Sequence, residues 1–282
     1  MDLQPGKFTV CALTYGDHTD LARRCFQSIA DRVDPQWVDS VRIGFNDACN
    51  ATLREARKIF DGCPVPVWGF EPGKNALKYP LMRKMFYRES LPVTTEYVMW
   101  FDDDSCIVPP SGDSFFSDIA NKMASTQATV LGDVWVMPFQ GRQQENIKQQ
   151  SWYTGKPWIK YRNKDVMKFA TGGWWTADFA TLKRWSYPWV ALKHNGGDTT
   201  LGEMLNQQGL NLVPYKHGLW INADDKGRNS KAKRRGESQR TVWYDMAPLG
   251  VGNQHDFEVK LFRLDETEKP VAIQTVKRIP GL

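Results

Sequence analysis

The chain has 282 residues, of which 41% are hydrophobic and 24% are charged, so it can bury a substantial core as one large domain or two small ones. No apolar run approaches the length of a membrane-spanning helix, and residues 1–7 lack the features of a signal peptide. We therefore expect a soluble protein of the cytoplasm, or of the host cytoplasm if the source is a virus. The five cysteines contain no C-x-x-C pair, which argues against a zinc knuckle or a redox pair.

The net charge of +5 is mild and supports nucleic-acid binding only weakly. Its distribution is more informative, because residues 226–235 carry six lysines and arginines and no acidic residue. This basic segment has three interpretations: a lid over a phosphate-bearing ligand, a contact for nucleic-acid phosphates, or a solvated loop. The 12 tryptophans are core residues or, in part, a stacking surface for sugars or bases.

Strands and helices alternate along the first hundred residues. The apolar pattern predicts strands over 8–14, 41–45, 65–70 and 97–101, the third of them at a sheet edge because Pro66 interrupts it. Between these strands the pattern predicts helices over 19–29, 51–60 and 81–88. Such alternation is typical of a Rossmann-like, mostly parallel central sheet flanked by helices.

The second half of the chain is less regular. We expect helices over 114–125, 177–185 and 198–208, and extended segments over 130–139, 212–214, 218–221 and 257–264. No element is predicted between 140 and 168. Residues 171–175 are expected to form a glycine-marked loop, and residues 223–240 a mobile basic loop.

An apolar run at 97–101 leads directly into Asp102, Asp103 and Asp104. Such a run suits a strand buried on both faces, and ligands of open α/β sheets bind at the carboxyl ends of strands. Adjacent carboxylates repel one another unless a cation lies among them. Because strand side chains alternate, we expect Asp102 and Asp104 to face one Mg²⁺ or Mn²⁺ ion and Asp103 to face away. The alternative is a solvated acidic loop that binds no metal.

Two common nucleotide-binding motifs are missing from the sequence. There is no G-x-x-x-x-G-K-[ST], which disfavours a P-loop nucleotidase. No G-x-G-x-x-G follows the first strand, where Thr14-Tyr15-Gly16 forms a turn with a single glycine, so a dinucleotide site is also disfavoured.

The order of these features resembles that of nucleotide-sugar-dependent glycosyltransferases with the GT-A fold, closest in pattern to family 2. The resemblance rests on segments between residues 8 and 222: Thr14–Gly16, Asn46–Asp47, Lys74–Arg83, Asp102–Asp104, Thr171–Trp175 and Gly196–Gly209. It implies a single GT-A domain over 1–282, with a nucleotide-sugar half over about 8–110 and a smaller acceptor half over about 111–222. A basic loop over about 223–240 and a C-terminal extension over 241–282 would follow.

The resemblance also implies roles for individual residues. The donor, a UDP-sugar as first choice, would be bound by Thr14, Tyr15, Gly16, Asp47, Lys78, Arg83, Asp102, Asp103, Gly172 and Gly173. A Mn²⁺ or Mg²⁺ ion would be held by Asp102, Asp104 and His217, and the acceptor by Trp174, Trp175, Arg234 and Arg235. For the tryptophans, core packing is the simpler alternative.

In an inverting transferase of this kind, Asp198 would take the proton from the acceptor hydroxyl. The alternative is that Asp198 only caps the helix that follows it. The family often has two acids here, whereas this chain has Gly197-Asp198, and Glu203 is a second, more distant candidate.

The motifs leave the acceptor open. Hydroxymethylated pyrimidine in DNA is one candidate, because some GT-A-like proteins, including phage and base-J-type transferases, act on such bases and must hold phosphates and an extruded base. A saccharide or protein acceptor explains the core motifs equally well. Two other classes compete: a nucleotidyltransferase, which would need a glycine-rich signature after the first strand, and a non-catalytic nucleic-acid-binding protein, which leaves the three acids unexplained.

Overall fold

The computed structural model describes residues 7–109, 114–139, 141–192, 196–221 and 257–266. Its helices are α1 (Thr19–Ala30), α2 (Asn50–Phe60), α3 (Lys78–Tyr87), α4 (Phe115–Thr126), α5 (Gly141–Lys148), α6 (Phe179–Arg184) and α7 (Gly197–Gln208). Its strands are β1 (Phe8–Tyr15), β2 (Val38–Asn46), β3 (Val67–Glu71), β4 (Tyr97–Asp102), β5 (Ser105–Ile107), β6 (Val130–Pro138), β7 (Ile159–Tyr161), β8 (Lys164–Asp178), β9 (Leu212–Pro214), β10 (Leu219–Ile221) and β11 (Lys260–Arg263).

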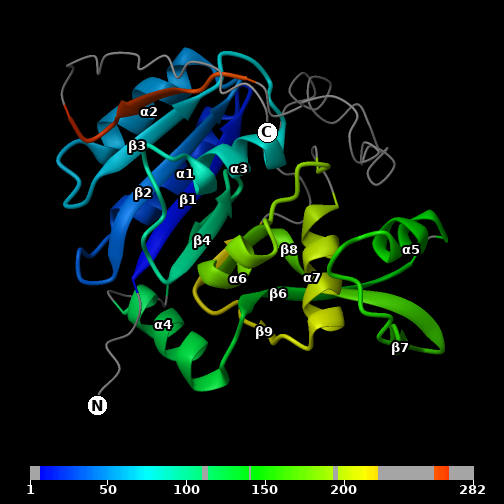
Figure 1. Ribbon diagram of the computed structural model, residues 1–282. Coiled ribbons are helices and arrows are strands. Elements are labelled where there is room, and N and C mark those ends of the chain that lie inside the picture. The colour runs from blue at the N-terminus through cyan, green and yellow to red at the C-terminus, as the bar shows by residue number, and fades with distance from the viewer. Residues whose placement is uncertain (1–6, 110–113, 140, 193–195, 222–256, 267–282) are drawn as a thin grey trace.

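One large mixed sheet organises the described residues. Its strand order is β11-β3-β2-β1-β4-β8-β6-β9, and β7 pairs with β8 outside this path. The strands β3, β2, β1 and β4 run parallel, as the alternation predicts, whereas β8 is antiparallel to both of its neighbours, β4 and β6. Helices flank the sheet (Figure 1), so the expected α/β class is confirmed.

The strand β3 is not at the edge of the sheet, contrary to the prediction. The C-terminal strand β11 pairs antiparallel with it, from Lys260 opposite Glu71 to Arg263 opposite Trp68. Pro66 precedes the strand, so its missing N–H does not interrupt the pairing. Part of the C-terminal extension is therefore built into the central sheet, next to β3.

Residues 171–175 do not form a loop. They lie inside the 15-residue strand β8, where Trp174 pairs with Phe101 and Trp175 with Trp100 of β4. Gly172 and Gly173 lie where the register of β8 against β6 shifts, between Ala170 and Trp175, and neighbouring groups approach the strand closely there.

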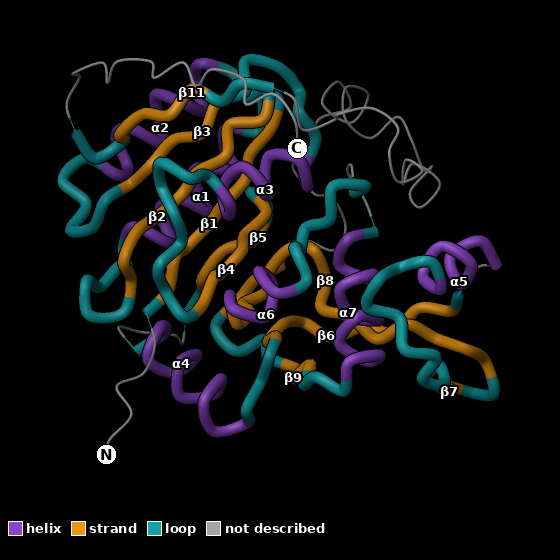
Figure 2. The backbone as a smooth tube through the Cα atoms, viewed as in Figure 1, coloured by secondary structure: helices purple, strands orange, loops and turns teal. Residues whose placement is uncertain are grey.

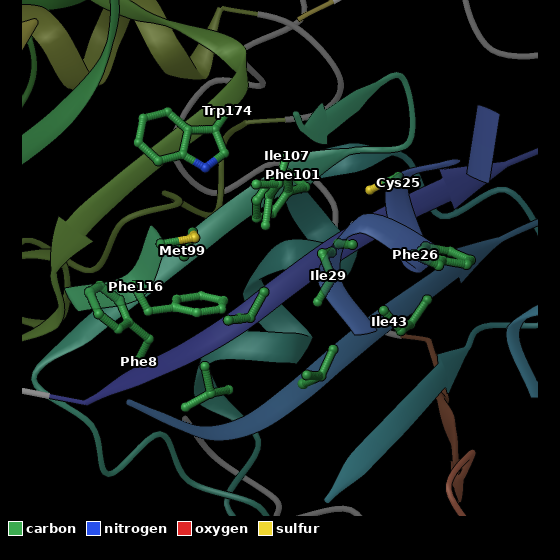
Figure 3. Close-up of a cluster of buried hydrophobic side chains, with 14 of the residues drawn as sticks. Phe8, Cys25, Phe26, Ile29, Ile43, Met99, Phe101, Ile107, Phe116 and Trp174 are labelled. Carbon is green, nitrogen blue, oxygen red and sulfur yellow. The ribbon is translucent and has the colours of Figure 1, made fainter. Parts of the chain in front are cut away.

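The sheet is buried on both faces, and β4 shows this best, since Val98 to Phe101 are all 0% exposed. Met99 and Phe101 belong to the apolar cluster shown in Figure 3, with side chains from α1, β2, β5, α4 and β8. Val98 and Trp100 belong to a second cluster, to which α3, α6 and α7 contribute. The prediction of a strand buried on both faces is confirmed.

The distal halves of β6 and β8, together with β7 and α5, extend away from the rest of the molecule (Figure 2). The helix α5 and the strand β7 occupy the region 140–168, for which the sequence predicts no element. Among the described residues, none of the helices has the length and apolar character needed to cross a membrane.

Candidate active site

The three acids at the end of β4 have different surroundings, because the strand stops at Asp102 and the chain turns at Asp103 and Asp104 before β5. The strict alternation of faces assumed from the sequence therefore ends at Asp102. Asp102 accepts hydrogen bonds on both carboxylate oxygens, from Lys78 Nζ at 2.7 Å and from Trp100 Nε1 at 2.9 Å. A metal ion would have to compete with the Lys78 ammonium for this carboxylate.

Asp103 ties the end of β4 to the loop after β1. Its Oδ2 accepts a hydrogen bond from Thr14 Oγ1 at 3.0 Å and from the amide of Tyr15 at 3.4 Å, and Asp103 is only 1% exposed. His18 Nδ1 lies 4.0 Å from the same oxygen. This arrangement contradicts the expectation that Asp103 and the Thr14 hydroxyl contact the donor, because the two groups are buried against each other.

Asp104 is the third acid, and its predicted role as a cation ligand stays a prediction. It lies in the turn directly before β5 and is 7% exposed. A carboxylate at a strand end offers the hard oxygen ligands that Mg²⁺ and Mn²⁺ prefer. In the described part of the chain no three acidic, histidine or cysteine side chains converge as a metal-binding group.

His217 does not lie beside Asp104. The strand β10 pairs antiparallel with β5, with Ile221 opposite Ser105, and the Gly218 carbonyl accepts a hydrogen bond from Val108. Asp104 and His217 therefore lie beyond opposite ends of this short ladder. This register contradicts the prediction that His217 completes the metal site. The position that follows Ile221 toward Asp104 lies outside the described residues.

Lys78, at the start of α3, connects three elements of the candidate site. Besides Asp102, its Nζ donates to the Gly172 carbonyl of β8 at 3.0 Å, and Lys78 is 8% exposed. A methyl group placed on Gly172 would lie 3.1 Å from Lys78 Nζ and 3.6 Å from Asp198 Oδ2. Lys78 and Asp198 thus lie on either side of Gly172. Both residues are predicted from the sequence to belong to one site, and the structure brings them together.

Asp198 lies in the first turn of α7, and the N-cap of that helix is Gly196. Because the cap position belongs to another residue, Asp198 is not simply an N-cap. Its Oδ1 accepts a hydrogen bond from the amide of Thr199 at 2.8 Å, and its own amide donates to Tyr79 Oη at 3.2 Å. Burial raises the pKa of the Asp198 carboxyl, while the nearby Lys78 ammonium and the Thr199 amide lower it.

Glu203 is not an alternative to Asp198. It is 0% exposed and accepts hydrogen bonds from Asn206 at 3.0 Å and from Gln207 at 2.9 Å. Gln207 in turn binds the backbone of Thr154 and Lys156. Glu203 therefore belongs to a network that holds the 152–158 segment to α7.

Gly173 is the second glycine of β8 in this region. A methyl group on it would lie 2.7 Å from Ile221 Cγ2 and 2.9 Å from Ser105 Oγ, closer than real contacts allow. Gly173 thus lets β8 pass directly against β5 and β10, next to the acidic turn. Its predicted role in donor binding stays a prediction.

Two further expectations are contradicted by the packing. Arg83 Nη1 donates to the carbonyls of Ser186 and Pro188, both at 2.9 Å, so it holds a loop rather than the donor. Trp174 and Trp175 are 0% and 2% exposed, which excludes them as an acceptor surface in this arrangement.

The remaining predicted residues divide into two groups. Asp47 is exposed at φ +53° directly after β2, whereas Gly16 is buried at φ +61° in the turn after β1. Contacts of either with a nucleoside stay predictions. Arg234 and Arg235 lie outside the described residues, as does the whole basic segment 226–235.

Two groups that shape the site have no role among those predicted from the sequence. The Trp100 indole holds Asp102, and the Tyr79 hydroxyl holds the backbone of Asp198. The first was readable, because residues two apart on a strand share a face and Trp100 precedes Asp102 by two. The second joins residues 119 positions apart and has no local signal.

Comparison with solved structures identifies the architecture. A mannosyltransferase from Pyrobaculum calidifontis, in complex with GDP-Man and Mn²⁺, is similar with a TM-score of 0.50 and 13% identity, over 74% of this chain and 55% of that one. Core-mannan synthase A from Aspergillus fumigatus, in its Mn/GDP form, is similar with a TM-score of 0.51 and 6% identity, over 74% of this chain and 73% of that one.

The chain has the GT-A fold. It spans about half the length of the Pyrobaculum transferase. No protein-family model and no curated protein sequence matches the chain, so the likeness is one of architecture. In this fold the carboxyl end of β4, the strand β8 and the start of α7 lie side by side.

Proposed function

We propose that the protein is a metal-dependent glycosyltransferase that moves a sugar from a nucleotide-sugar donor to an acceptor hydroxyl. The observation that carries this proposal is the convergence of Asp198, Lys78 and Asp102 around Gly172, beside Asp104, in a GT-A fold. A carboxylate at a helix start next to an acidic strand end supplies the two functions that glycosyl transfer requires. These are a base for the acceptor and a place for a cation near the donor diphosphate.

The residues present fit a Mg²⁺ or Mn²⁺ ion. Such ions keep several waters and take substrate phosphates as ligands, so one or two carboxylates suffice on the protein side. Asp104 is the first candidate ligand, and Asp102 precedes it by two residues in the chain. When bound, the ion would neutralise the donor diphosphate and so make it a better leaving group.

Asp198 is the proposed general base. The acceptor hydroxyl oxygen forms a bond to C1 of the donor sugar, the bond from C1 to the phosphate oxygen breaks, and the nucleoside diphosphate leaves with that electron pair. The hydroxyl proton passes to Asp198. Because burial raises the pKa of this carboxyl, Asp198 is a stronger base than an ordinary aspartate. Attack in a single step from the side opposite the leaving group would invert the configuration at C1.

The proposed use of a nucleotide-sugar donor is tested by measuring hydrolysis of UDP-glucose, UDP-N-acetylglucosamine and GDP-mannose. Each is measured once with Mn²⁺ and once with a chelator. We expect cleavage of at least one nucleotide sugar, dependent on metal and lost in Asp104→Asn. The absence of cleavage for an extended panel, with no binding of any nucleoside diphosphate, would refute the proposed function.

The acceptor requires a separate experiment. A hydroxymethylated pyrimidine in DNA is supported by the mild positive charge and by the basic segment 226–235. Transfer of a radiolabelled sugar to DNA containing 5-hydroxymethylcytosine or 5-hydroxymethyluracil is compared with transfer to unmodified DNA and to simple saccharides. If only saccharides are labelled, the proposed transferase activity stands and the proposed DNA acceptor is refuted.

A further inference from the structure

The side chain of Lys78 is held in a fixed place between two strands. Its Nζ donates to Asp102 Oδ2 on β4 at 2.7 Å and to the Gly172 carbonyl on β8 at 3.0 Å. Lys78 is 8% exposed, and a long cationic side chain is seldom so buried unless it is paired. Both of its partners belong to the walls of the candidate site.

The backbone before Lys78 is strained and is held by a network of amides. Leu77 has a φ of +67°, a conformation that costs a non-glycine residue free energy and persists only where the surroundings impose it. The Asn75 side chain accepts from the Leu77 amide at 3.0 Å, and the buried Asn46 side chain accepts from the Ala76 amide at 2.7 Å. Asn46 also donates to Asn75 at 3.0 Å. This network fixes the start of α3 and therefore the direction in which Lys78 leaves it.

The ammonium of Lys78 also faces Asp198. Gly172 separates the two, since a methyl group on it would contact Lys78 Nζ at 3.1 Å and Asp198 Oδ2 at 3.6 Å. The pKa of the Asp198 carboxyl is lowered by Lys78 and raised by Asp102, so the two partners of the ion pair act on Asp198 in opposite directions. The Lys78 ammonium thus bridges β4 and β8 by hydrogen bonds and acts on Asp198, in the first turn of α7, through its charge.

We propose that Lys78 is a positioning residue, which holds the Asp102 carboxylate and the Gly172 carbonyl together and thereby fixes the place of Asp198 relative to the donor. The catalytic consequence rests on the proposed function, whereas the positioning itself does not. The Lys78 ammonium donates its two hydrogen bonds to protein groups, the Asp102 carboxylate and the Gly172 carbonyl. We therefore assign Lys78 to orienting the site and not to binding the donor. This replaces the donor-binding role expected from the sequence.

The test compares Lys78→Met, which keeps the length of the side chain and removes its charge, with Lys78→Arg and with Lys84→Met. Lys84 lies on the same helix, and its ammonium lies over the Phe257 ring at 5.3 Å, so it is a matched control for the loss of one charge from α3. Two measurements are made on each full-length variant: Mn²⁺-dependent hydrolysis of the nucleotide sugar that the wild type cleaves, and hydrogen–deuterium exchange of peptides covering 168–178 and 197–205.

In Lys78→Met we expect kcat to fall about 100-fold, since a misplacement of about 1 Å in a catalytic group has an effect of this size. The donor KM should change by less than about threefold, because no donor contact is removed. Exchange should become faster in both peptides, and Lys84→Met should change neither measurement. Lys78→Arg should recover at least about tenfold in kcat, because it retains the charge.

A raised donor KM with unchanged kcat in Lys78→Met would overturn the proposal and make Lys78 a donor contact. Unchanged exchange at 197–205 would overturn it as well, whatever the activity. If the wild type cleaves no nucleotide sugar, the proposed function fails, and the exchange measurement alone still decides whether Lys78 holds β8 and α7 in place.

Discussion

The two halves of the molecule build their part of the site in different ways. In residues 8–107 successive strands pair with near neighbours, and Asp102 to Asp104 end a strand whose burial pattern is visible in the sequence. In residues 130–221 the strand β8 instead inserts between β4 and β6 in antiparallel orientation. The first half thus presents acids at a strand end, and the second half brings Asp198 to them through long-range pairing. The candidate site exists only where the halves meet.

The largest effect is expected from Asp104→Asn, which removes the proposed cation ligand of the first half. Donor hydrolysis should fall roughly a thousandfold, because stabilisation of a diphosphate leaving group is worth several kcal/mol. Calorimetry should show that Mn²⁺ binding is lost. Asp103→Asn should lower the thermal midpoint and keep Mn²⁺ binding, because Asp103 is bonded to Thr14 and Tyr15. Equal loss of Mn²⁺ binding in both variants would contradict this division of roles.

The next effect concerns the second half. Asp198→Asn should lower kcat by about 10² to 10⁴-fold with little change in donor KM, as expected for loss of a general base. The control is Glu203→Gln on the same helix, which should retain kcat because Glu203 faces a structural network. In the wild type, kcat/KM should fall at low pH with an apparent pKa above the ordinary aspartate value. An unchanged pH profile in Asp198→Asn would refute the assignment.

A smaller effect compares close packing in the two halves, through one glycine in each. A methyl group on Gly202 of α7 would lie 2.2 Å from the Lys168 carbonyl oxygen, which is backbone and cannot move easily, so Gly202→Ala should displace α7 from β8 and lower kcat about tenfold. A methyl group on Gly69 of β3 would lie 2.4 Å from the Phe262 ring. Gly69→Ala should therefore lower the thermal midpoint with kcat retained. If kcat fell in Gly69→Ala and not in Gly202→Ala, the two halves would have the opposite roles.

The smallest effect is on stability as a function of pH. Burial raises the pKa of Asp198 in the folded state, so the folded protein binds more protons than the unfolded chain between the two pKa values. The stability that Asp198 contributes is present below its unfolded pKa and is lost as pH rises through the folded pKa. The thermal midpoint of Asp198→Asn, relative to wild type, should therefore increase as the pH rises from the ordinary aspartate pKa through the raised pKa of the folded state. Parallel curves for the two proteins would show that Asp198 is not destabilised by burial.

The first half was largely predictable because its signals are local. The apolar run at 97–101 predicts a strand buried on both faces, and the alternation of strands and helices predicts the parallel sheet. The place of Asp198 at the start of a helix is predictable because a regular helical pattern begins there and ends at Gly209.

The errors all concern partners that are distant in sequence. Two adjacent glycines predict a loop at 171–175, and only the pairing of β8 with β4 shows that close packing explains them. The register of β10 on β5, which separates His217 from Asp104, cannot be read from either segment alone. Trp174 and Trp175 were assigned to a surface because the sequence does not show that a sheet strand lies on each side of them.

The hydrogen bond between Thr14 and Asp103 has a consequence for how such a chain can diverge. The two residues are 89 positions apart and buried against each other, so a change at Asp103 alone takes from the buried Thr14 hydroxyl the carboxylate that accepts its hydrogen bond. A change at Thr14 alone removes one of the donors to the buried Asp103 carboxylate. We expect them to change together among related sequences: a chain without an acid at 103 should also lack a hydroxyl at 14, while position 104 varies independently of both.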